Sequence, residues 1–243
     1  MRKVTMKKIV LFTLLSFPIL LFGQEDSSKD SPLVKLEGIG IFKIGKTTTS
    51  ELEKMGPVKT VTPMSLMISK EYLMEKGVFV DPKPSHPAIK TYYILNYELN
   101  SEIKIDLKLE FYQDTLYEAL SSNQIRAVGN GYCSYGTKKL LDALEIAGYL
   151  KNKTDLSSIK TYQNRMGATF ERENTIYNYD YNTNTNIIGE GYFEKEYITD
   201  TKTSSSYYIV LYDSLIKKKV SSLIQELMEQ KIKSENQKLT EGL

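Results

Sequence analysis

The hydrophobic and polar positions alternate most clearly near the middle of the chain. In the segment 103–111 every second residue is apolar and the residues between them are charged, which is the pattern of a half-buried antiparallel strand. A second strand-like segment, 91–99, precedes it across a short polar turn, and a third, 115–119, follows another tight turn. These three segments predict an antiparallel meander.

The pattern is more broken toward the N-terminal side of this meander. Segment 33–44 indicates strand structure interrupted by two glycines, and segment 45–57 indicates a short helix that Thr or Ser caps and a Gly-Pro pair ends. Segment 64–76 has scattered apolar residues without a clean period, so it stays ambiguous. The run 81–87 contains three prolines and predicts an open loop.

Three glycines, at 129, 131 and 136, mark a break, and we place a subdomain boundary at residue 129. A helix over 138–147 follows, with leucines on one face and Gly148 at its end. A second set of strands is expected at 160–171, 175–182, 189–199 and 205–213. The chain then closes with an amphipathic helix over 215–233, whose apolar stripe is Val220, Leu223, Ile224, Leu227 and Met228.

Together these elements predict an α+β fold, in which antiparallel strand meanders are packed by a few helices. The predicted parts are an α+β subdomain at 33–128, a second α+β subdomain at 129–233, and a flexible tail at 234–243. In each predicted subdomain, a helix is followed by a strand meander. This similarity of the two halves is compatible with a distant duplication, although no repeat of fixed period is present.

The first residues have the layout of a secretory signal peptide, predicted at 1–23. Four basic residues precede an apolar run that contains Pro18 and ends at Gly23. The run is shorter than the roughly 20 apolar residues of a bilayer-spanning helix, so we expect cleavage after Gly23 and no stable membrane insertion afterwards. The alternative to a cleaved signal peptide is an uncleaved N-terminal membrane anchor. Met6 is an alternative to Met1 as the start of translation. The polar segment 24–32 is predicted to be a disordered lead-in.

Removal of this segment changes the charge of the chain. The whole sequence has a formal charge of +2, and loss of four basic residues and no acidic residue takes it to −2. No basic footprint for nucleic acid remains. The chain has one cysteine, Cys133, so it can form no internal disulfide. We interpret Cys133 as a small buried residue, with a reactive thiol or a bond between chains as the alternatives.

A phosphate-loop pattern occurs between Gly40 and Thr47. It consists of glycine, four residues, and then Gly45-Lys46-Thr47, ahead of a predicted helix. Such a loop needs a flexible turn whose amides surround the anion, whereas residues 41–44 alternate like a strand. An exported protein also meets little nucleoside triphosphate. We therefore expect a strand, a glycine turn and a helix cap, with no nucleotide and no other cofactor.

The candidates for metal or acid–base chemistry are few. His86 is the only histidine and lies in the proline-rich loop, so neither a zinc site nor a serine triad is expected. A carboxylate pair for glycoside hydrolysis would have to come from acidic residues of one segment, which are Glu190, Glu194, Glu196 and Asp200. Their alternation with aromatic residues more simply indicates the solvated face of a strand.

An alternating aromatic row is the strongest candidate for a binding face. Tyr177, Tyr179 and Tyr181 would line one side of a strand, where tyrosines can stack on sugar rings or anchor a partner. Ordinary cross-strand packing of the three rings is the alternative interpretation.

The segment 42–57 carries a family resemblance. Its Gly45-Lys-Thr turn, helix and Gly56-Pro57 ending resemble the opening of the SmpA/OmlA (BamE-like) small envelope domains, and Leu107–Tyr117 looks like their final hairpin. The similarity covers 40–120. This chain departs from the family pattern in three ways: it has no lipid-bearing cysteine after the leader, its helix ends in Gly56-Pro57 without the residue that the family has between the glycine and the proline, and it carries a long insertion at 64–90. The Phe-Gly-Gln leader end also looks like those of exported Bacteroidetes proteins.

The resemblance implies a small α+β scaffold for protein contacts and no catalytic residues. We therefore expect an exported, periplasmic or secreted protein that acts without catalysis through contact with an envelope or secreted protein. A glycan or small-molecule binding module and a carboxylate-dependent hydrolase are the two alternatives. An immunity or inhibitor protein is a further interpretation.

Overall fold

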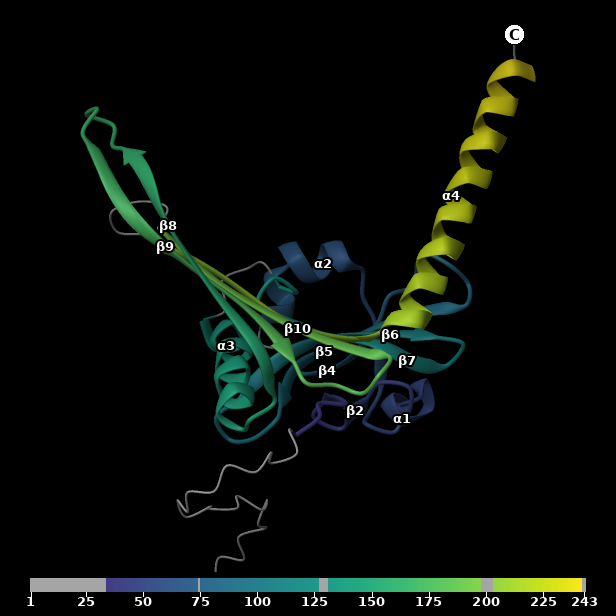
Figure 1. Ribbon diagram of the computed structural model, residues 1–243. Helices are drawn as coiled ribbons and strands as arrows, with labels where there is room; N and C mark the ends of the chain where they lie inside the picture. The colour runs from purple at the N-terminus through teal and green to yellow at the C-terminus, as the bar shows by residue number, and fades with distance from the viewer. Residues whose placement is uncertain (1–33, 74, 127–130, 198–202, 242–243) are drawn as a thin grey trace, which may run out of the picture. The chain divides into compact units, whose positions relative to one another are not determined.

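The structure is a computed structural model that describes residues 34–73, 75–126, 131–197 and 203–241. The segment Leu33–Leu243 forms one compact unit, and its mixture of helices with a large, mostly antiparallel sheet confirms the α+β class (Figure 1). The predicted leader 1–23 and lead-in 24–32 lie outside the described residues.

The strands form two sheets. The smaller sheet is a hairpin of β1 (Gly38–Ile39) and β2 (Phe42–Lys43). The larger sheet has nine strands in the order β3-β4-β5-β6-β7-β11-β10-β9-β8, and only the β3–β4 pair is parallel. These strands are β3 (Val58–Thr60), β4 (Gly77–Val80), β5 (Ile89–Glu98), β6 (Lys104–Tyr112), β7 (Thr115–Ser122), β8 (Leu150–Gln163), β9 (Thr169–Tyr181), β10 (Ile187–Tyr197) and β11 (Thr203–Asp213).

The helical elements are short near the N-terminal side and long near the C-terminal side. They are α1 (Thr49–Glu53), α2 (Pro63–Ile68), the 3-10 helix η1 (Lys70–Leu73), α3 (Gly131–Ile146) and α4 (Ser214–Glu241). Within the described residues, no helix is both long and apolar enough to cross a membrane.

The predicted central meander is confirmed as β5, β6 and β7. Alternation in β6 buries Ile105, Leu107 and Leu109 against the main core. The boundary predicted at residue 129 falls between β7 and α3. The sheet itself continues through both segments, because β7 pairs with β11.

One strand was predicted wrongly. Instead of a strand over 160–171, the structure has β8 over Leu150–Gln163, a turn, and then β9 from Thr169. Asn164 makes this turn, since its side chain accepts the amide hydrogens of Met166 and Ala168. β8 is an edge strand with most of its residues exposed, so its sequence shows no alternation of apolar and polar positions.

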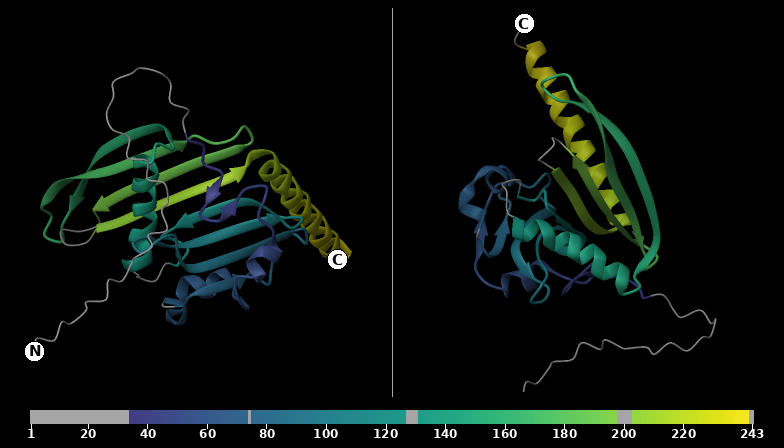
Figure 2. Two further views of the ribbon diagram at one scale, coloured as in Figure 1. Left: turned by 90° about the horizontal axis from the view of Figure 1, so that it is seen from below. Right: turned by 90° about the vertical axis from the view of Figure 1, so that its left-hand side faces the viewer.

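Helix α3 packs on one face of the sheet, over β6, β7 and β11. It approaches closely because Gly136 has no side chain: a Cβ there would lie 1.7 Å from the carbonyl oxygen of Lys104. The hydroxyls of Thr137 and Ser121, both fully buried, form a hydrogen bond of 2.9 Å at the same contact. Figure 2 shows α3 on this side of the strands.

Asp213 precedes the first residue of helix α4, and its carboxylate accepts the amide hydrogens of Leu215 and Ile216 at 2.9 Å each, as an N-cap does. Its first turns pack on the opposite face of the sheet from α3 through Val220. The helix runs to Glu241, past the end predicted at 233, so segment 234–241 belongs to it. The sequence has no Pro or Gly between residues 192 and 241 that would end the helix earlier.

Candidate functional site

The sheet face opposite α3 carries a set of polar and aromatic side chains between α2 and α4. Strand register places these residues on one face, because directly paired residues point to the same side. We call this surface the open face. Its members are Lys108, Glu110, Glu118, Leu120, Glu190, Tyr192, Glu194, Tyr208, Val210 and Tyr212. Most of them are half-buried, and in Figure 1 the helix α4 stands at one end of this face.

Two carboxylates meet directly at the centre of the open face. Glu110 on β6 pairs with Glu118 on β7, an arrangement that is destabilising unless it is compensated. Lys108 forms an ion pair with Glu110, and Lys217 from α4 forms one with Glu118 at 2.8 Å. Burial disfavours the charge of Lys108, but the adjacent Glu110 outweighs it and raises the pKa of Lys108. The pair is therefore held as two neutralised ion pairs.

Three tyrosines continue the open face toward the β9 side. Tyr192 and Tyr208 are direct partners on β10 and β11, and their rings stack with centroids 5.5 Å apart. The hydroxyl of Tyr212 donates to Glu190 at 3.1 Å, and the ammonium of Lys217 lies 3.9 Å from the centre of the Tyr212 ring. Such aromatic groups with polar ends are common anchors in protein interfaces.

Both Tyr192 and Glu194 on this face have shifted pKa values. Burial and the hydrogen bond to Glu194 raise the pKa of Tyr192 to about 12. Asn174 and Tyr192 both donate to Glu194 and lower the pKa of its carboxyl. A general acid or base works best with a pKa near the working pH, and these shifts move both groups away from pH 7.

The predicted carboxylate candidates lie on this face, each with its own partner. Glu190 accepts from Tyr212, Glu194 accepts from Asn174 and Tyr192, and Glu196 pairs with Lys160 at 2.6 Å. They alternate along β10, as predicted for the solvated face of a strand. Asp200 lies outside the described residues.

The predicted aromatic row is not an open platform. Tyr179 and Tyr181 are only 4% and 3% exposed, because α3 covers this side of the sheet and Leu141 belongs to the same core cluster. Tyr177 is half-buried and stacks on Phe193 at 5.9 Å. The expectation of a binding face there was wrong. The alternative of cross-strand packing holds for Tyr177, whereas Tyr179 and Tyr181 stack on each other along β9, opposite the glycines of β10.

The phosphate-loop pattern folds as the β1–β2 hairpin and the turn after it. Gly40 and Gly45 both have positive φ angles, and Phe42 and Ile44 point into the core. The backbone amides of this segment bond within the protein: Gly45 donates to Leu116, and Lys46 and Thr47 donate to Lys43. Lys46 pairs with Glu37 at 3.1 Å.

The remaining predicted candidates do not gather at one place. His86 is half-buried in its loop and accepts the amide hydrogen of Ala88 through Nδ1 at 3.0 Å. The side chain of Cys133 lies outside the described part of the structure. Among the described residues, no three His, Cys, Asp or Glu side chains are placed to hold a metal ion.

A groove of about 590 Å³ lies at the other end of the large sheet, between the loop after α1 and strands β4 and β5. Its apolar wall includes Met55, Val78 and Ile94. Its rim carries two lysines, each paired with a glutamate: Lys59 with Glu75 at 3.3 Å and Lys76 with Glu98 at 3.6 Å. The volume suits a small molecule.

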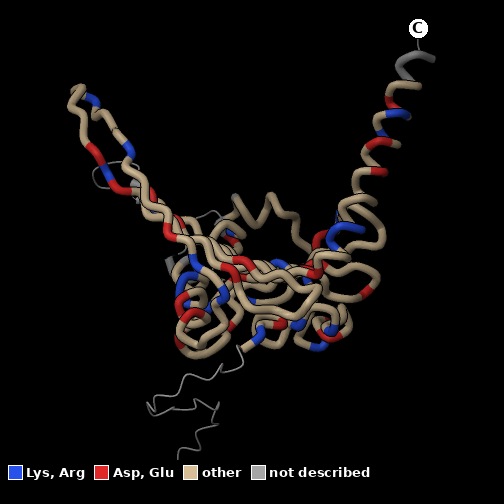
Figure 3. The backbone as a smooth tube through the Cα atoms, in the orientation of Figure 1, with Lys and Arg blue, Asp and Glu red and all other residues tan. Residues whose placement is uncertain are grey.

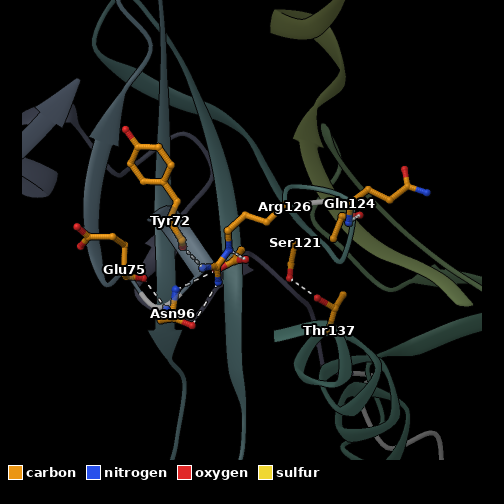
Figure 4. A network of polar contacts seen from close by, with 9 residues as sticks. Tyr72, Glu75, Asn96, Ser121, Gln124, Arg126 and Thr137 are labelled. Carbon is orange, nitrogen blue, oxygen red and sulfur yellow. Dashed lines mark hydrogen bonds and ion pairs between the residues drawn. The ribbon is translucent and has the colours of Figure 1, made fainter. Parts of the chain in front are cut away.

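Sequence reasoning missed the buried polar network shown in Figure 4. The guanidinium of Arg126 donates to both carboxylate oxygens of Asp106, at 2.6 and 2.7 Å, and to the carbonyl of Tyr72 at 2.6 Å. It also donates to the side chain of Asn96, which has a φ of 54° within an irregularity of β5. The network ties η1, β5 and β6 together.

No family model, curated protein or solved structure matches this chain.

Proposed function

We propose that this chain is an exported, non-enzymatic protein of the cell envelope or the secreted fraction, and that its open face binds a protein partner. The observation that carries the proposal is the stacked pair Tyr192–Tyr208, which is partly exposed on the open face beside its paired charges. Partly exposed tyrosines beside charged groups are typical of protein interfaces.

The electrostatics of the face favour binding over catalysis. Tyr192 has a pKa raised by burial and by Glu194, while the pKa of Glu194 is lowered by its hydrogen-bond donors. Both groups keep their ordinary charge states at neutral pH, which supports recognition more than proton transfer. The leader-like segment 1–23 and the resemblance to the SmpA/OmlA domains support the envelope setting.

A capture experiment tests this proposal. The tagged protein is expressed in its own cells, with Tyr192→Ala/Tyr208→Ala beside wild type and Tyr135→Ala as the matched control. Tyr135 is 65% exposed on α3, and so lies on the other face. We expect a partner retained by wild type and by the control and lost from the double variant. Equal retention by all three, with each variant folded by circular dichroism, would contradict the proposal.

The groove between the α1–β3 loop and β5 supports a second candidate function, the binding of a small molecule. Its volume of about 590 Å³ and its apolar wall are the observations that favour this function. Substitution of Met55, which is 42% exposed, by Glu would place a charge on that wall. Loss of a ligand that co-purifies with wild type, while capture of the protein partner is unchanged, would favour this candidate.

A further inference from the structure

Strand β8 is the edge of the nine-stranded sheet and lacks the features that usually protect such an edge. It is 14 residues long, contains no proline, and has its one register irregularity at its start, between Leu150 and Asn152. Natural edge strands are commonly short, bulged, or guarded by lysines that point outward. Here Lys153 is paired with Glu145 on α3, and Lys160 with Glu196 on β10.

Behind the distal half of β8, strand β9 has no further paired strand. Pairing of β9 with β10 ends at Thr175 and Lys195, whereas pairing of β9 with β8 continues to Thr169. Residues 158–163 and 169–174 therefore form a two-stranded arm, which Figure 1 shows projecting beyond the other strands. A two-stranded ribbon alone is at best marginally stable in water.

The arm and the part of β8 just before it carry exposed apolar side chains, which an added strand would help to cover. Ile159 is 70% exposed and Leu156 is 50% exposed, on opposite faces of β8 because their numbers differ by an odd count. A groove of about 480 Å³ beside Ile159 is lined by Ser157, Ser158 and residues 171–173. Figure 3 shows basic and acidic residues interspersed along the arm, so no single charge repels a second strand.

We infer that β8 pairs with β8 of a second copy of this chain, antiparallel and about a twofold axis through Ile159. This axis is perpendicular to the sheet. For every pair of facing residues, the two residue numbers then add up to the same even number. With Ile159 at the centre, Ile159 meets the partner's Ile159 and Leu156 meets the partner's Tyr162. Ser157 then faces the partner's Thr161, and Asp155 faces the partner's Gln163.

The sequence of β8 favours this centre over its neighbours. An axis at Asp155 or at Lys160 would place two like charges directly opposite each other, and an axis at Ser157 would place Asp155 against the partner's Ile159. The centre at Ile159 opposes no like charges and covers the apolar residues of the arm on both faces. Four strands then form the arm, which satisfies the requirement for more than two strands.

Sedimentation velocity on the native protein tests this pairing, with charge variants at the axis. We expect a dimer for wild type and monomers for Ile159→Lys and for Ile159→Glu, each with a dimer dissociation constant raised roughly tenfold or more. An equal mixture of the two variants should recover the dimer, because Lys then faces Glu. Met166→Lys, at the 94% exposed tip outside the paired segment, is the control and should remain dimeric.

Cysteine cross-linking fixes the register. In a Cys133→Ser background, Ile159→Cys should form an interchain disulfide on mild oxidation, whereas Thr161→Cys should not, since its partner position is residue 157. A monomeric wild-type protein, a dimer unaffected by Ile159→Lys, or cross-linking at 161 in place of 159 would each overturn the inference. These outcomes are independent of partner capture by Tyr192 and Tyr208.

Discussion

Arg126 donates two hydrogen bonds to the carboxylate of Asp106, and both side chains are almost fully buried, at 2% and 4% exposed. Removal of one member leaves the other charge buried without its partner, which costs about 3–5 kcal/mol. We therefore expect Arg126→Met to lower the free energy of unfolding by that amount in urea titrations.

Two controls separate this effect from a general loss of charge. Lys59→Met breaks the exposed pair with Glu75 and should cost less than about 1 kcal/mol. The double variant Asp106→Leu/Arg126→Met should recover much of the loss, because it leaves no unpaired buried charge. A loss for Arg126→Met as small as for Lys59→Met would contradict the structural role of the network.

Gly136 tests the close contact between α3 and β6. In an exposed helix, alanine is favoured over glycine by about 1 kcal/mol. Helix propensity alone therefore predicts that Gly136→Ala stabilises the protein. Here the new Cβ would meet the carbonyl oxygen of Lys104 at 1.7 Å, and that atom belongs to the backbone. We expect a net loss of about 1–3 kcal/mol in thermal or urea unfolding, against a change within about 0.5 kcal/mol for Lys139→Ala.

The pKa of Glu194 gives a pH-dependent test of the open face. Donation by Asn174 and Tyr192 lowers this pKa from its ordinary value of 4.5. A lowered folded-state pKa means that the carboxylate stabilises the fold above 4.5 and loses this contribution as the pH falls through the folded value. Carbon-13 NMR of the carboxyl should show a midpoint below 4.5, and Asn174→Ala should raise it.

A matched variant on the same strand, Asn178→Ala, should leave that midpoint unchanged. A midpoint at or above 4.5 in the wild-type protein would show that the hydrogen bonds to Glu194 are absent in solution.

Val220 tests how α4 is held to the body. It is 4% exposed and packs with Ile89, Tyr112 and Tyr117. Val220→Ala removes two buried methyl groups, so we expect a loss of about 2 kcal/mol and faster amide exchange in the first turns of α4. Met228→Ala, at a 60% exposed site farther along the helix, should change stability by less than about 0.5 kcal/mol. Equal effects of both changes would contradict the packing.

The parts of the fold predicted from sequence are those with local signals. Segment 103–111 alternates because one face of β6 is buried, and Asn100 and Asp114 lie in the tight turns that connect it to its neighbours. The C-terminal helix has a clear apolar stripe but no breaker before Gly242, so its start was predicted better than its end. β8 lies at an edge with both faces exposed. Its sequence therefore has no regular alternation of apolar and polar residues from which a strand could be predicted.

The candidate site depends on contacts between distant segments. The alternation of Tyr179 and Tyr181 with the polar Asn178 and Asp180 marks one face of β9 as more apolar, but the strand does not show that α3 covers this face. The pairing of Glu110 with Glu118 follows from the register of β6 and β7. The Arg126 network depends on the irregularity in β5 around Asn96, for which this single asparagine at positive φ is the local signal in the sequence.

Site-specific photo-crosslinking in living cells tests the central claim most directly. A photoreactive amino acid replaces Tyr208 on the open face or, as the control, Tyr135 on α3. We predict a discrete protein adduct from position 208 that position 135 does not give and that Tyr192→Ala weakens. No adduct from position 208, or the same adducts from both positions, would contradict a protein-binding role for the open face.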